Sequence, residues 1–440
     1  MTPDSKLFEA FRPGAQLTRP SHWLGALVWC WSMTVIAADI KLSNEIYVHW
    51  VATALLFAFG FPVLLYAKCS LRSPLYFASA GMVIATLAAT LNSPDLVYGL
   101  EQALKLGVIL IGGLLLFSSD PYYAHVAFRA FIASVYLNSA LVLLGFFGWD
   151  KAASQMSPGR WGTVLNFPGS LWRCGILVLG YAMMESIESR GRRGRSVLLL
   201  GLSLGLIMAD GSRTGLLLVP FALVYCGYVL LCRRSRTAVP KAIVTLLVVA
   251  TAGGAWMLLG GDIATREEYG ESGFTRIERL FTNYSRGGLS GGRDSDEARV
   301  AMLMDSLDAI ALHPLLGGGI GTTRSETEGG PIVVHMSYLQ IWSDLGILGF
   351  VSYLGLSCGW LLLARRALKR IRELGSSTDR ALYYNALFLL FCFAFAGLLH
   401  PLSTEWSEWV TYIVPLGLLI HLTRKNQTRS TNSLSVEQSS

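Results

Sequence analysis

Charged residues are scarce in this chain of 440 residues, because Asp, Glu, Lys and Arg together make up 15% of it, against about 25% in soluble domains. Hydrophobic residues make up 52%, and the mean hydropathy is +0.47. One soluble core could not hide so much apolar surface, and disordered, collagen-like and disulfide-rich chains have other compositions. The composition therefore predicts a protein that crosses the membrane many times and is covered by lipid.

Several kinds of chemical site are also missing from the sequence. The seven cysteines lie in apolar stretches or at their cytoplasmic edges, so no disulfide framework is expected. There is no Cys/His spacing for zinc and no paired-acid loop for calcium or magnesium. There is also no exposed Ser-His-Asp order, no cysteine nucleophile and no outside Asp-x-Asp, and the acids Asp95, Glu405 and Glu408 are scattered. We therefore expect a reaction that needs no metal, cofactor or covalent enzyme intermediate.

About twelve apolar stretches are long enough to cross a bilayer, at roughly 20 residues each. The seventh is short, and the fourth is weakened by Glu101 and Lys105. The stretches are 22–41, 47–67, 74–93, 99–118, 122–147, 168–187, 195–210, 213–232, 241–260, 334–363, 381–399 and 408–423. They predict an all-α fold of about twelve transmembrane helices.

Lys and Arg gather before the first of these spans and after the second, sixth, eighth, tenth and twelfth. All these clusters face the cytoplasm if both termini are cytoplasmic, so the net charge of +7 reflects the positive-inside rule and not nucleic-acid binding. We expect transmembrane helices 1–9 in residues 1–260, a large outside loop at 261–333, helices 10–12 at 334–425 and a disordered cytoplasmic tail at 426–440.

The outside loop at 261–333 carries only arginines as basic residues, and these include Arg286 and Arg299. Arginine binds phosphate oxygens well, although these arginines could instead pair with the many acids of the loop. Residues 295–312 predict a helix whose apolar stripe would pack on the transmembrane body or at the lipid interface. That stripe is Val300, Leu303, Met304, Leu307 and Ile310. The following LLGGGIG predicts a tight turn, either a plain one or one whose amides approach an anion.

Three further candidate residues stand at the outside ends of predicted spans, and a fourth, Arg160, lies in the outside segment 147–168. His335 stands at the start of the span 334–363. Its imidazole suits proton abstraction from a hydroxyl, and the alternative is an interfacial histidine bonded to a backbone carbonyl. Arg213 opens the helix 213–232, where it suits a phosphate or reaches the lipid headgroups. Arg160 stands beside the interface residue Trp161, and Arg173 lies just inside the sixth span, where a charge is a functional candidate.

A polar stripe follows His335 into the same span. Ser337, Gln340 and Asp344 recur at helical spacing, and such groups face the protein interior or a wet cavity. The stripe therefore predicts an internal polar surface next to the candidate base.

Three motifs together resemble a known membrane family. They are SRTGLLLVP at 212–220, the arginine and HPLLGGGIG across 299–321, and HMSYLQIWSDLGILG at 335–349. They are similar to the family that contains bacterial O-antigen ligases, O-antigen polymerases and pilin-type O-oligosaccharyltransferases. Met336 and Leu303 stand where that family often has Asn and Trp.

The resemblance implies a GT-C-like, metal-independent glycosyltransferase of lipopolysaccharide assembly in the bacterial inner membrane. Its donor would be an undecaprenyl-diphosphate-linked glycan and its acceptor the lipid A–core, joined on the periplasmic side. Arg213 and Arg299, and next Arg160 and Arg286, would bind the diphosphate. His335 would be the base, or its hydrogen-bond partner, in an inverting displacement. O-antigen polymerase, protein O-oligosaccharyltransferase and a transporter or flippase remain the alternatives.

Overall fold

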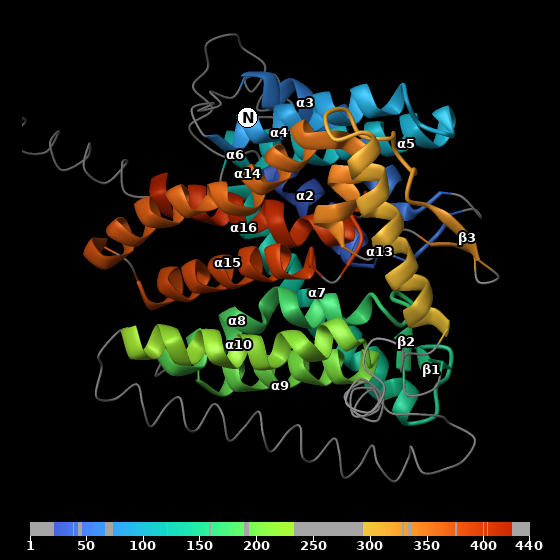
Figure 1. The fold of residues 1–440 in the computed structure, drawn as a ribbon. Helices are drawn as coiled ribbons and strands as arrows, with labels where there is room; N and C mark the ends of the chain where they lie inside the picture. The colour runs from blue at the N-terminus through green and yellow to red at the C-terminus, as the bar shows by residue number, and fades with distance from the viewer. Residues whose placement is uncertain are drawn as a thin grey trace, which may run out of the picture.

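The computed structural model consists mainly of helices (Figure 1). It describes residues 22–37, 39–42, 46–66, 74–120, 122–157, 160–188, 193–232, 294–327, 330–332, 334, 336–374, 376–398, 400–402 and 404–424. Its helices are α2 (His22–Ile36), α3 (Val48–Tyr66), α4 (Pro74–Thr90), α5 (Leu96–Gly107), the π-helix η1 (Val108–Gly112), α6 (Gly113–Ser119), α7 (Tyr122–Phe146), α8 (Leu171–Glu188), α9 (Arg193–Asp210), α10 (Arg213–Cys232), α13 (Asp294–Leu312), α14 (Ser337–Leu374), α15 (Ser377–Ala396) and α16 (Trp406–Arg424).

Two short antiparallel hairpins accompany the helices. In the first, β1 (Ala153–Ser157) pairs with β2 (Arg160–Thr163), and the register shifts between Gln155 and Ser157. In the second, β3 (Ser325–Thr327) pairs with β4 (Gly330–Ile332). These hairpins lie in connections between helices, so the fold remains essentially all-helical, as predicted.

Each predicted span within the described residues coincides with a helix or a run of helices. In the described part, four helical stretches are long and apolar enough to cross a membrane, namely Leu96–Phe117, Tyr122–Phe146, Ser337–Arg372 and Ser377–Ala396. The first is the fourth predicted span, in which Lys105 Nζ lies 2.8 Å from Glu101 and 3.1 Å from Glu405. The span at 241–260 and the tail at 426–440 lie outside the described residues, so the total of twelve stays a prediction.

Helix α16 lies at the centre of the bundle. Its Trp406, Trp409 and Tyr412 are buried, and the helix packs on α15, α14, α7 and α6. Trp31 of α2 meets Trp406 edge to face at 5.0 Å between ring centroids. In Figure 1, α15 and α16 lie between the group α8, α9 and α10 and the helix α14, which also packs on α4. Large aromatic rings on α16 therefore join the two sides of the bundle.

Helix α13 confirms the helix predicted at 295–312, and of the two environments expected for its apolar stripe the structure favours the lipid interface over packing on the transmembrane helices. Met302 and Ser306 are the buried side chains, whereas Leu303, Met304 and Leu307 are 37%, 55% and 44% exposed. The helix contacts α14 and lies across the ends of the bundle helices in Figure 1. The apolar stripe thus faces away from α14, which leaves the lipid interface as its expected environment.

The glycine-rich turn after α13 docks on α14 through backbone contacts. Gly318 N donates to Ser343 O at 2.8 Å, Gly319 N donates to Asp344 O at 3.1 Å, and Ile347 N donates to Pro314 O at 3.1 Å. The sequence left open whether these amides approach an anion. Gly321 N donates to the carboxylate of Asp344 at 3.2 Å, so the anion at this turn is a side chain of the protein itself.

Two glycines make this close approach sterically feasible. Gly346 has φ 69° and ψ −168°, which interrupts α14, and a Cβ there would lie 2.2 Å from Leu315 O. Gly317 has φ 73°, and its Cβ would lie 2.3 Å from Asp344 O. Any side chain at either position would separate the turn from the helix.

We predict that Gly346→Ala destabilises the protein by about 1–3 kcal/mol, because alanine disfavours the positive φ and clashes with Leu315 O. The thermal unfolding midpoint of the detergent-solubilised protein measures the loss. Gly205→Ala in α9 is the control, since a Cβ there meets nothing within 4 Å, and it should leave the midpoint unchanged or slightly higher. Equal midpoints for wild type and Gly346→Ala would contradict the prediction.

Candidate functional site

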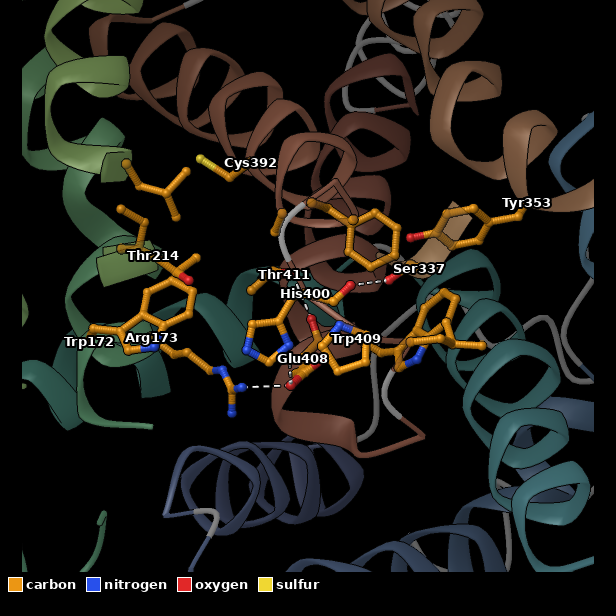
Figure 2. A pocket seen from close by; sticks show the side chains of 17 residues that line it. Trp172, Arg173, Thr214, Ser337, Tyr353, Cys392, His400, Glu408, Trp409 and Thr411 are labelled. Carbon is orange, nitrogen blue, oxygen red and sulfur yellow. Dashed lines mark hydrogen bonds and ion pairs between the residues drawn. The ribbon is translucent and has the colours of Figure 1, made fainter. Parts of the chain in front are cut away.

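A cavity of about 620 Å³ lies where α8, α10, α14, α15 and α16 meet (Figure 2). The first turns of four of these helices line it with Arg173 of α8, Thr214 of α10, Ser337 of α14 and Glu408 of α16. These helices therefore begin at the same end of the bundle. Helix N-termini carry a partial positive charge, so this end of the bundle favours an anion.

Arg173 supplies a full positive charge to the wall of this cavity. Its Nη2 donates to Glu408 Oε1 at 2.6 Å, and its Nη1 lies 3.4 Å from Ser407 Oγ. Figure 2 shows this pair spanning the space between α8 and α16. The sequence identified Arg173 as a candidate, and the structure adds its partner Glu408, one of the three scattered outside acids.

His400 is a second polar residue of this wall that the sequence analysis missed. It lies in the connection between α15 and α16, with Nδ1 3.9 Å from Glu408 Oε1. Its carbonyl accepts bonds from Ser337 N at 2.9 Å and Ser337 Oγ at 2.8 Å. An imidazole, a carboxylate and a guanidinium thus meet beside the start of α14. The only sequence signal was a His-Pro pair directly after a predicted span.

Arg160, a predicted phosphate ligand, lies on β2 and is paired with Asp210. Its Nε donates to Asp210 O at 3.1 Å, and its Nη2 donates to Asp210 Oδ1 at 3.3 Å. Asp210 is buried and also accepts the N–H groups of Gly169 at 2.9 Å and Trp172 at 3.0 Å. The carboxylate therefore caps the start of α8, and Arg160 is held beside the turn that carries Arg173.

The other predicted site residues are only partly covered by the structure. His335 and Arg286 lie outside the described residues. The backbone of Arg213 begins α10, as predicted, and that of Arg299 lies in α13, but the side chains of both lie outside the described part. The cavity is nevertheless lined by Thr214, the residue after Arg213, and by Ser337, two residues after His335.

Glu405 forms a second charged cluster near the start of α16. It accepts hydrogen bonds from His49 Nε2 at 2.9 Å, Trp50 Nε1 at 3.0 Å and Lys105 Nζ at 3.1 Å. Burial alone would raise the pKa of Glu405, but the bonds from His49 and Lys105 outweigh it and hold that pKa below its ordinary value of 4.5. The sequence places Glu405 among three scattered outside acids, and the structure adds its partners, which come from α3 and α5.

Among the residues that the structure describes, no group of three or more His, Cys, Asp or Glu side chains is arranged to hold a metal ion. The polar groups of the cavity wall are instead bonded to one another and to the backbone. The site as described therefore presents an arginine, an imidazole and helix N-termini as its groups for binding an anion.

In a comparison with family models, residues 198–354 match the model described as O-antigen ligase. The matched segment contains α10, α13 and the first part of α14, and in the sequence it includes Arg213, Arg299 and His335. The match confirms the resemblance that the three motifs predicted. No curated protein matches the chain.

Asp210→Asn should lower the stability of the protein by about 1–3 kcal/mol, because the Arg160 guanidinium loses its charged partner and the cap of α8 weakens. The thermal unfolding midpoint reports the loss. Asp150→Asn, in an exposed turn, is the control and should stay within about 0.5 kcal/mol of wild type. If Asp210→Asn unfolded at the same midpoint as the wild type, the pair of Arg160 and Asp210 would contribute nothing to stability.

We also predict a pH-dependent difference between wild type and Glu405→Gln. A carboxyl whose pKa is lowered by folding stabilises the protein above its unfolded value of 4.5, and this contribution is lost as the pH falls through the folded pKa. Unfolding midpoints measured from pH 7 to pH 3.5 should therefore differ most near neutrality and converge in acid. A difference that stays constant with pH would be inconsistent with the ion pairs of Glu405.

Proposed function

We propose that this protein, which carries an O-antigen ligase family domain at residues 198–354, is a glycosyltransferase of the bacterial inner membrane. It transfers an O-antigen glycan from undecaprenyl diphosphate to the lipid A–core during lipopolysaccharide assembly, at the periplasmic face. The observation that carries the proposal is the cavity at the starts of α8, α10, α14 and α16, since an arginine and four helix N-termini there suit a diphosphate.

Positive charge at the diphosphate would drive departure of the leaving group. Negative charge develops on the bridging oxygen as the glycosidic bond breaks, and fixed cations stabilise it. We assign this role first to Arg213 and Arg299, with Arg160 and Arg286 next. Thr214 in the cavity wall supports the assignment of Arg213, because adjacent Cα atoms are about 3.8 Å apart.

The acceptor hydroxyl must lose a proton as it attacks the anomeric carbon of the donor glycan. We assign proton removal, or orientation of the hydroxyl, to His335, whose neutral imidazole suits this role near pH 7. Ser337 lines the cavity, and two peptide units keep its Cα within about 7–8 Å of the Cα of His335. A single displacement inverts the anomeric centre and requires no metal. Isolation of a glycosyl-enzyme would contradict this mechanism.

The rest of the cavity suits the lipid part of the donor. Leu218, Phe393 and Trp409 belong to its lining, beside the polar groups described above. A polyprenyl chain would leave the diphosphate along such apolar side chains into a lateral groove between the helices. The lipid A–core acceptor is also held by the membrane, so both substrates can reach the same end of the bundle.

We predict that purified protein in lipid nanodiscs joins an undecaprenyl-diphosphate glycan to core lipopolysaccharide in the presence of EDTA. His335→Ala should reduce the rate by about 10²–10⁴-fold, the usual contribution of a general base. His125→Ala is the control, because His125 lies on α7 beside His421 and does not line the cavity. Gel electrophoresis of the labelled lipopolysaccharide measures the product.

Three outcomes would count against this assignment. A requirement for Mg²⁺ would contradict the metal-free mechanism, and an active His335→Ala protein would remove the proposed base. Deletion of the gene separates ligase from polymerase. Loss of surface polymer with accumulation of long lipid-linked chains identifies a ligase, whereas single repeats on the core identify a polymerase.

A further inference from the structure

A second cavity of about 480 Å³ lies beside the first, between α4, α5, α14 and the glycine-rich turn. Leu402, in the connection between α15 and α16, lines both cavities. The connection therefore borders two spaces, of which only the first has an arginine in its wall. The function proposed above makes no use of the second.

The second cavity offers neutral hydrogen-bonding groups. Thr404 Oγ donates to Gln102 Oε1, and Leu402 N donates to Gln340 Oε1 at 2.7 Å. Both bonds use the amide oxygen of the glutamine. The side chain of Gln340 also hydrogen-bonds to Asp344, so Gln102 Nε2 is the amide donor that can face a ligand. Tyr98 and Thr86 add hydroxyl groups to the lining. The cavity wall thus offers uncharged hydrogen-bonding groups, which suit sugar hydroxyls.

The charge of the second cavity argues against an anionic ligand. Asp344 lines it as a buried carboxylate that accepts bonds from Gly321 N at 3.2 Å and Thr323 Oγ at 3.3 Å. None of the described residues that line this cavity is Lys or Arg. A phosphate or an acidic sugar would find no cation in this lining, whereas a neutral ring needs none.

We infer that the second cavity binds one uncharged pyranose ring of a substrate glycan, held by the amide of Gln102 and the neighbouring hydroxyl groups. The inference rests on the proposed function, since it names the part of a glycan substrate that lies beyond the diphosphate site.

This assignment gives a role to two motifs that the proposed reaction leaves unexplained. Gln340 and Asp344 belong to the polar stripe of α14, and Gly321 belongs to the glycine-rich turn. Both motifs lie in the segment that matches the O-antigen ligase model. The stripe thus lines both cavities, with Ser337 in the first and Gln340 in the second.

The test measures sugar binding without transfer, by saturation-transfer difference NMR on the full chain in nanodiscs. The probes are methyl β-D-glucopyranoside and methyl β-D-galactopyranoside, with glucuronate as the charged comparison. We expect ring-proton signals from at least one neutral glycoside and none from glucuronate. Gln102→Leu should weaken binding about tenfold, because the sugar loses a hydrogen-bond donor, and Gln102→Trp should abolish it by filling the cavity.

Leu100→Ala on α5 is the matched control, because Leu100 is 46% exposed and lines neither cavity. It should bind the sugars like wild type, and all variants are first checked for a wild-type unfolding midpoint. Sugar signals that persist in Gln102→Trp would overturn the inference. Equal binding of glucuronate would overturn it too, as would the absence of signals from both neutral glycosides.

Displacement of the bound glycoside identifies the substrate that carries the ring. Undecaprenyl-diphosphate glycan should displace it if the ring belongs to the donor, and core lipopolysaccharide should do so if it belongs to the acceptor. If neither substrate displaces the glycoside, the inference is overturned. If a substrate displaces the bound sugar but the protein transfers no glycan, only the proposed function is refuted. The two failures are therefore distinguishable.

Discussion

The hydrogen bonds between the start of α14 and the connection from α15 to α16 organise this end of the protein. Ser337 binds the carbonyl of His400, and Gln340 binds the amide of Leu402. These bonds help to fix the path of the connection between the two cavities. Because the same connection leads into α16, it also places Glu408 opposite Arg173. A few bonds between one helix and one loop thus shape the walls of both cavities.

The charged groups of this region are arranged in pairs that join distant parts of the chain. Arg173 joins α8 to α16, Lys105 joins α5 to Glu405, and Arg160 joins β2 to the end of α9. In an apolar surrounding an isolated charge is costly, so each pair favours a single relative position of its two elements. Charged residues that weakened the prediction of a span in the sequence therefore serve as contacts between that span and other elements of the protein.

The helices were predictable because membrane spans require long uninterrupted apolar runs, and such runs can be read locally. The start of α10 at Arg213 and the helix α13 were predicted for the same reason. The O-antigen ligase resemblance was carried by short motifs and is confirmed over residues 198–354.

The contacts of the site were not predictable, because they join residues far apart in the sequence. The acids Glu405 and Glu408 were considered scattered, since nothing local reveals Lys105 or Arg173 as their partners. The environment of the apolar stripe of α13 was left open between the transmembrane body and the lipid interface. Apolar periodicity cannot separate the two, because near a lipid interface an apolar stripe can also face outward.

The interruption of α14 at Gly346 constrains how this protein can change during evolution. The segment from Ser337 to Gly346 is tied to other backbone segments at both ends. One residue inserted between these ties would rotate the preceding turns by about 100°, since an α-helix has 3.6 residues per turn. Ser337 and Gln340 would then point away from their partners in the neighbouring connection. Side chains of this stretch that make none of these contacts can therefore be exchanged, but its length cannot, and descendants of the chain should vary here by substitution alone.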